Sequence, residues 1–154
     1  MFDSLKPLLT NKTAAILFVG IGNRLKSDDA IGIYICENLQ TSNNIKTLLV
    51  EASIEKYVGK INSLAPDILV LTDCTDFNEN PGFFKMLEIH EMPDNTFHTH
   101  TVSLRRISEF FEMKVFLLGV QPKNVKFGEE FTQPVQAAAD KIIAWINQNL
   151  IQSC

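Results

Sequence analysis

The chain has 154 residues, of which 45% are hydrophobic and 21% charged, a composition typical of one globular domain with a sizeable core. Its formal net charge of −4 leaves no basic stripe to offset phosphates, so nucleic acid is not expected as a partner. Its 3 cysteines include no Cys-x-x-Cys pair, which favours reduced thiols in the cytoplasm over a disulfide framework or a structural zinc site. We expect neither a signal peptide nor a membrane-spanning segment, because no apolar run is long enough.

Five apolar segments are expected to form β-strands, at residues 14–20, 45–51, 67–72, 83–89 and 114–120. Most are dense in Ile, Val, Leu and Phe rather than strictly alternating, which predicts a sheet covered on both faces.

Helical spacing of apolar residues fills most of the gaps between these strands. It predicts helices over 31–39, 54–64 and 135–150, and another after Thr101. Thr132 is a candidate N-cap for the last helix, and Pro134 suits its first turn. The alternation predicts a single domain over residues 1–154, a three-layer α/β/α sandwich around a twisted, mostly parallel five-stranded sheet.

The segment Gly20–Gly32 reads GIGNRLKSDDAIG and joins the first strand to the first helix. Its glycines allow a sharp turn. The acidic pair Asp28 and Asp29 then stands at the helix entrance, where a carboxylate can cap a helix or hold a metal.

Ligands of open α/β sheets bind outside the carboxyl ends of the parallel strands. Asp73 follows directly on the strand at 67–72, so Asp29 and Asp73 converge if the first and third strands are neighbours. With a histidine from the following loop, His98 or His100, they would form a three-ligand site for a divalent transition metal. Each residue also has a structural interpretation, because Asp73 can close a turn and the two histidines can be solvated loop residues.

A dinucleotide site is disfavoured, because Leu25 stands where G-x-G-x-x-G requires its third glycine. Two carboxylates at the helix entrance would also repel a pyrophosphate. Of the thiols, Cys36 is expected in the core, and Cys74 lies beside the candidate site without an identified activating partner.

At these residues the sequence resembles the hydrogenase maturation endopeptidases, which process the large subunit of nickel–iron hydrogenases. Five motifs carry the resemblance, in order and over nearly the whole chain: the glycine and acidic positions of 20–32, Leu71–Asp76 with Asn80–Gly82, Thr99-His100 with Leu104, Phe116–Pro122, and Phe131–Val135. The late Gln-Pro detail is most similar to members that serve hydrogenase 3-type enzymes.

The resemblance implies an endopeptidase that removes the C-terminal extension of a nickel-loaded [NiFe]-hydrogenase large-subunit precursor. Carried over by position, it implies that Asp29, Asp73 and His100 are both the metal ligands and the catalytic residues, with His98 a bystander. The metal is expected to be the precursor's own nickel, with zinc or another divalent ion as an alternative. We expect a cytoplasmic monomer without a membrane partner. A non-proteolytic metal-binding or escort module would use the same three ligands.

One motif departs from the family pattern. Many members carry Asp-Gly-Gly followed by Ser or Thr after the second strand, and this chain carries Glu51-Ala52-Ser53. The acid is kept in a longer form, but both glycines are lost, so a different loop shape beside the site is expected.

Overall fold

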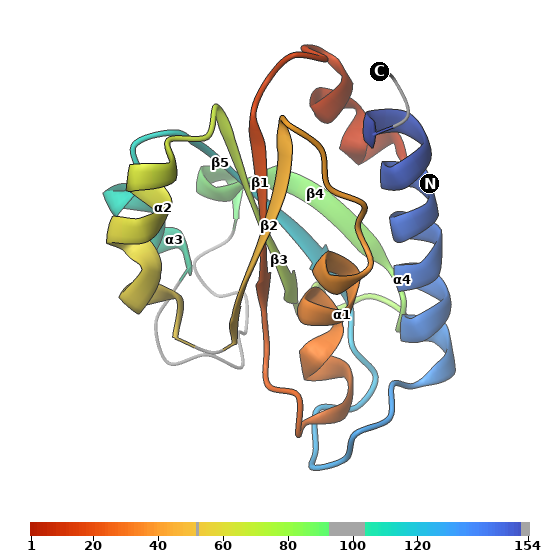
Figure 1. Cartoon of the computed structure of the whole chain (residues 1–154). Coiled ribbons are helices and arrows are strands. Elements are labelled where there is room, and N and C mark those ends of the chain that lie inside the picture. The colour runs from red at the N-terminus through yellow and green to blue at the C-terminus, as the bar shows by residue number, and fades with distance from the viewer. Residues whose placement is uncertain (52, 93–103, 152–154) are drawn as a thin grey trace.

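The computed structural model describes residues 1–51, 53–92 and 104–151, and shows three layers (Figure 1). The central sheet has the strand order β2-β1-β3-β5-β4. Its strands are β1 (Ile16–Ile21), β2 (Ile45–Glu51), β3 (Ile68–Cys74), β4 (Phe84–Glu88) and β5 (Lys114–Val120). The first four in spatial order are parallel and β4 pairs antiparallel at the edge, so the predicted three-layer α/β fold is confirmed.

Helices cover both faces of the sheet (Figure 1). The α-helices are α1 (Ile31–Glu37), α2 (Val58–Leu64), α3 (Leu104–Ile107) and α4 (Gln133–Ile146). Helices α1 and α4 lie on one face, and α2 and α3 lie on the other. A 3₁₀ segment at Asp3–Leu9, which the sequence patterns did not predict, packs beside β4 and buries Leu5 and Leu8.

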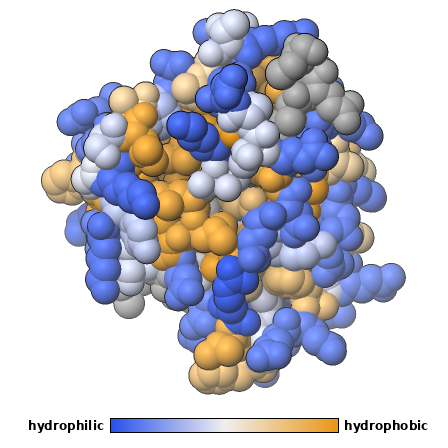
Figure 2. Space-filling model, in the orientation of Figure 1, coloured by the Kyte–Doolittle hydropathy of each residue, from blue (hydrophilic) through white to orange (hydrophobic). Residues whose placement is uncertain are grey.

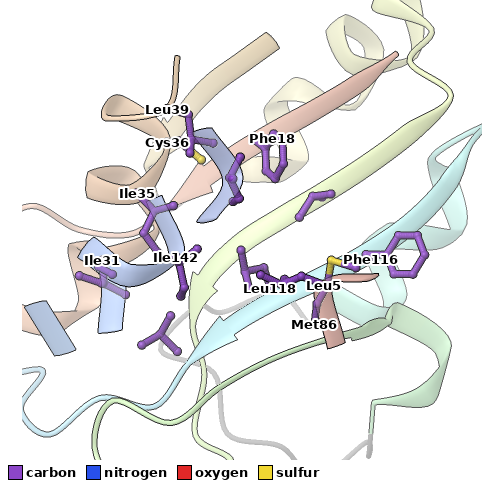
Figure 3. Close-up of a cluster of buried hydrophobic side chains, with 14 of the residues drawn as sticks. Leu5, Phe18, Ile31, Ile35, Cys36, Leu39, Met86, Phe116, Leu118 and Ile142 are labelled. Carbon is purple, nitrogen blue, oxygen red and sulfur yellow. The ribbon is translucent and has the colours of Figure 1, made fainter. Parts of the chain in front are cut away.

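Alternate residues of each strand feed two separate cores. In β1, Phe18 packs toward α1 and α4, whereas Leu17 and Val19 pack toward α2. Figure 3 shows the first core, in which Ile31 and Ile35 of α1 lie beside Ile142 of α4 in the same cluster as Phe18 and Leu118 of the strands. The three central strands β1, β3 and β5 are buried on both faces and are therefore largely apolar, which explains why they were recognisable in the sequence. No helix in the described part of the chain is long and apolar enough to cross a membrane.

The strand order fixes where the functional residues lie. Strands β1 and β3 are direct neighbours, with Gly20 paired to Thr72. The segments that leave the carboxyl ends of these two strands therefore start side by side, as the convergence of Asp29 and Asp73 requires.

Candidate active site

Two glycines set the close packing of the turn after β1. A Cβ atom on Gly22 would lie 2.1 Å from the carbonyl oxygen of Asp29, so only glycine fits there. A Cβ atom on Gly32, in α1, would lie 2.0 Å from the carbonyl oxygen of Thr72 on β3. Without a side chain at Gly22, the acidic turn can pack closely against the end of β1. Without one at Gly32, the start of α1 can pack closely against Thr72 of β3, the residue before Asp73. The two glycines serve the approach of backbone to backbone rather than a phosphate loop.

Asp29 lies in a 3₁₀ turn, Ser27–Ala30, directly before α1, and its side chain is 2% exposed. The backbone N–H of Asn23 donates to Asp29 Oδ2 at 2.9 Å, and the Asn23 side chain accepts from the N–H of Leu25 at 2.9 Å. Asn23 therefore shapes the turn with its side chain, and its backbone N–H orients the carboxylate of Asp29.

Asp73 is the next-to-last residue of β3 and is fully buried. It pairs with Gly119 on β5, and its Oδ1 accepts a hydrogen bond from the N–H of Cys74 at 2.8 Å. The 3₁₀ turn that carries Asp29 contacts β3 directly. The structure therefore places both predicted carboxylates, buried, at the carboxyl edge of two adjacent strands.

The Cys74 thiol reports the negative charge that gathers at this edge. Burial raises the pKa of Cys74 strongly, and the charges of Asp73 and Asp29 raise it further, followed by those of Asp28 and Asp76. A thiol held neutral is a poor nucleophile, so this site gives no support to a cysteine mechanism. Buried carboxylates that share one small region favour a bound cation.

Asp28 has a different function from the one expected of it. Neither the 3₁₀ turn nor α1 has a side-chain cap, so the interpretation of Asp28 as a helix cap was wrong. Its fully buried carboxylate instead accepts hydrogen bonds from the loop between β5 and α4: from Lys123 N, Asn124 N and Thr132 N at 2.8–3.0 Å, and from Thr132 Oγ1 at 2.7 Å. Thr132 does occupy the N-cap position of α4, but its hydroxyl is used by Asp28.

The third predicted ligand lies outside the described residues. His98 and His100 both fall within 93–103, so the choice between them stays a prediction. In the departing motif Ala52 is also outside them, but Glu51 is described and has a left-handed backbone, with φ of 49°. The carbonyl of Glu51 accepts from Gly22 N at 3.0 Å, so this left-handed residue lies directly against the turn that leads to the acidic pair.

Sequence reasoning missed a buried polar residue beside the site. Gln121 Oε1 accepts from Phe77 N at 2.6 Å, and its Nε2 donates to Asp76 Oδ1 at 3.2 Å. The side chain thereby ties the loop after β3 to the end of β5. The motif Gln-Pro had been noted only as a resemblance, although a polar residue that ends a buried strand was itself a signal.

A second group of potential metal ligands lies far from this edge. Among the described residues, Glu88, His90 and Glu91 bring ligand atoms within 4.8 Å of one another. They lie at the last residue of β4 and in the turn after it, at the opposite end of the sheet, since Glu88 pairs with Phe116 near the start of β5. Lys114 Nζ already contacts Glu88 Oε1 at 2.9 Å. His90 Nε2 lies 3.2 Å from the other oxygen of the same carboxylate, Glu88 Oε2.

The fold and the buried acidic edge define a three-layer α/β protein with two carboxylates at the carboxyl edge of its sheet, and comparison with known proteins specifies the class. The sequence model of a family described as hydrogenase maturation protease matches residues 33–149. The chain therefore belongs to the hydrogenase maturation protease family. It is a protease, which favours the enzyme over the alternative of a metal escort. Asp73 and His100 lie within the matched range, and Asp29 lies four residues before its start.

Individual relatives agree with this assignment. The chain is 28% identical over 142 residues to a Methanocaldococcus jannaschii protein assigned as a hydrogenase maturation protease, with 83% of each chain covered. It is 24% identical over 128 residues to the hydrogenase 3 maturation protease of Escherichia coli K12, covering 79% of this chain and 82% of that one. Among solved structures, the [NiFe] hydrogenase maturation protease HycI from Thermococcus kodakarensis matches with a TM-score of 0.82 and 28% identity, over 95% of this chain and 97% of that one.

Proposed function

We propose that this protease removes the C-terminal extension from a [NiFe]-hydrogenase large-subunit precursor, and that Asp29, Asp73 and His100 bind the nickel that the precursor carries. The observation that supports the proposal is the placement of Asp29 and Asp73, both buried, at the same edge of neighbouring strands. Carboxylate oxygens are suitable ligands for a divalent ion, and two of them at one edge could together bind an ion that the substrate delivers.

Two carboxylates and one imidazole are a donor set that suits Ni²⁺, Zn²⁺ or Mn²⁺. The backbone amides of Asn23 and Cys74 each hold one oxygen of a carboxylate, which orients both side chains before the substrate arrives. When bound, a divalent ion would identify a loaded precursor and supply Lewis-acid polarisation at the scissile carbonyl. The chain has no His-Glu-x-x-His motif, so a thermolysin-like arrangement has no support from the sequence. A monomer that acts in the cytoplasm, without nucleic acid or membrane, completes the proposal.

A processing assay with purified, nickel-loaded precursor tests these assignments. Asp29→Asn, Asp73→Asn and His100→Ala should each lower the rate of tail removal at least 100-fold, because each removes a ligand from a three-ligand set. The thermal midpoint of each variant, measured in parallel, separates loss of the site from loss of the fold. Processing at the wild-type rate by all three folded variants would overturn the site.

The two histidines provide a matched pair. His98→Ala should process like the wild type, and His100→Ala should not. The reverse pattern would move the third ligand to His98 and leave the carboxylates in place.

A further inference from the structure

An exposed hydrophobic pair lies at the tip of the molecule, next to the acidic turn. Leu25 is 53% exposed and Phe127 is 81% exposed, although one follows β1 and the other follows β5. The space-filling view shows hydrophobic side chains at its lower tip, where these two loops lie in Figure 1 (Figure 2). Burial of a phenylalanine side chain would be worth about 2 kcal/mol or more. Because Phe127 is exposed, it does not contribute this stabilisation to the fold.

The two side chains are brought together by backbone pairing. Lys26 and Gly128 form a parallel bridge, in which Gly128 N donates to Leu25 O at 2.9 Å and Ser27 N donates to Gly128 O at 2.6 Å. Leu25 and Phe127 each precede the bridged pair by one position. Residues at matching positions of a parallel ladder point to the same face, so the two side chains form one patch.

The fold holds this patch rigidly. The buried carboxylate of Asp28 binds both ends of the Phe127 loop, at Lys123 and Asn124 on one side and at Thr132 on the other. A preorganised surface loses little conformational entropy when a partner binds. The loop that carries Phe127 is therefore fixed in place, as expected of a surface that binds a partner.

Three exposed or partly exposed lysines lie within four positions of the patch residues, in a chain whose net charge is −4. Lys26, Lys123 and Lys126 flank the two hydrophobic residues, and none of their ammonium groups has a carboxylate partner within the described part of the chain. Glu129 and Glu130 follow Gly128 and are exposed as well, so the charged residues near the patch include both signs, with three lysines and two glutamates. A hydrophobic patch with a basic rim fits an apolar surface with an acidic rim.

We propose that Leu25 and Phe127, with Lys26, Lys123 and Lys126, form a docking surface for the folded body of the large-subunit precursor, and that the occupant is an apolar area of that body with acidic surroundings. This proposal rests on the proposed function. The argument for this occupant is that the patch is continuous with the proposed site. Lys26 is three residues before Asp29, so a protein bound to the patch lies beside the edge that we propose for its nickel and its C-terminal extension. Docking there would provide specificity that two carboxylates and an imidazole cannot supply.

Steady-state processing of nickel-loaded precursor tests the surface. The double variant Leu25→Ser/Phe127→Ser should raise KM at least ten-fold and leave kcat within about two-fold, because it removes contacts that are the same in the bound and transition states. The control is Phe110→Ser, since Phe110 is 65% exposed but precedes β5 at the opposite edge of the sheet, and its KM should be unchanged.

Charge variants give an independent readout. Lys123→Glu/Lys126→Glu should raise KM and weaken the dependence of kcat/KM on salt, whereas Lys60→Glu on α2 should change neither. A wild-type KM for both double variants would overturn the docking surface, while loss of processing in Asp73→Asn would still uphold the proposed function. Absence of processing by the wild-type protein would instead overturn the proposed function, and binding of the precursor to the patch, measured by calorimetry, would still test the surface.

Discussion

Asp28 and Thr132 lie 104 positions apart, and both the backbone N–H and the hydroxyl of Thr132 donate to the Asp28 carboxylate, at 2.8 and 2.7 Å. This contact joins the turn after β1 to the start of α4. It distinguishes the two members of the acidic pair, because Asp28 binds the loop before α4 whereas its neighbour Asp29 is the acid that we propose for the site.

Asp28→Asn should therefore be a stability variant. The new amide group would face backbone donors at a fully buried position, and we expect the free energy of unfolding to fall by about 2–3 kcal/mol. Urea denaturation measures this loss. Thr132→Val should cost less, about 1 kcal/mol, because it removes one donor of four. Unchanged urea midpoints for both variants would contradict the assignment.

Asp29→Asn should show the opposite pattern. The amide oxygen can still accept from Asn23 N, so we expect unfolding within about 1 kcal/mol of the wild type. Processing should nevertheless be lost, because the variant removes the charge of a proposed ligand. Stability and activity measured on the same preparation distinguish the two acids, and a destabilised but active Asp29→Asn protein would exchange their roles.

Gly32→Ala should be strongly unfavourable, because its Cβ would meet the carbonyl oxygen of Thr72 at 2.0 Å and backbone would have to move. We expect a loss of about 2–3 kcal/mol in thermal or urea unfolding. Gly59→Ala is the matched control, since Gly59 is exposed in α2 and an added Cβ would have no neighbour within 4 Å. It should gain about 0.5–1 kcal/mol. Equal effects at the two positions would exclude the close approach of α1 to β3.

Tyr34 joins α1 to α4 and makes the stability dependent on pH. Its phenol donates to Asp140 Oδ1 at 2.7 Å, and this hydrogen bond raises the pKa of Tyr34 above its ordinary value. The stabilisation is thus complete below about pH 10, the pKa of an unfolded tyrosine, and is lost as the pH rises through the raised pKa. Tyr34→Phe should cost about 0.5–1 kcal/mol at pH 7, and the difference from the wild type should shrink above pH 10. A difference that grows with pH would contradict this sign.

The buried thiols should be chemically inert. Burial raises the pKa of Cys36 to about 12 and that of Cys74 further, so neither forms a thiolate near neutral pH. We expect Cys74→Ala to keep processing within about three-fold of the wild-type rate, because the variant removes a small part of the core packing and no nucleophile. A folded Cys74→Ala protein without activity would restore the cysteine as a catalytic candidate.

The sequence predicted those features that a local pattern of apolar and polar residues marks. Strands such as β1 and β3 are buried on both faces, so they read as apolar runs, and the position of Asp73 at the end of such a run followed directly. The function of Asp28 was not predictable in this way, because its partners lie about 100 positions away and three of the four donors are backbone groups. The left-handed conformation of Glu51 was also hidden, because glycine is the residue that normally marks such a position.

The most direct test is the mass of the large-subunit precursor before and after incubation with the protease, with and without nickel in the precursor. We expect the wild-type protein to remove the C-terminal extension from the nickel-loaded form alone, and Asp73→Asn to leave both forms intact. Removal of the extension from the nickel-free precursor at the same rate, or processing by a folded Asp73→Asn protein, would contradict the assignment of this acidic edge to the substrate's nickel.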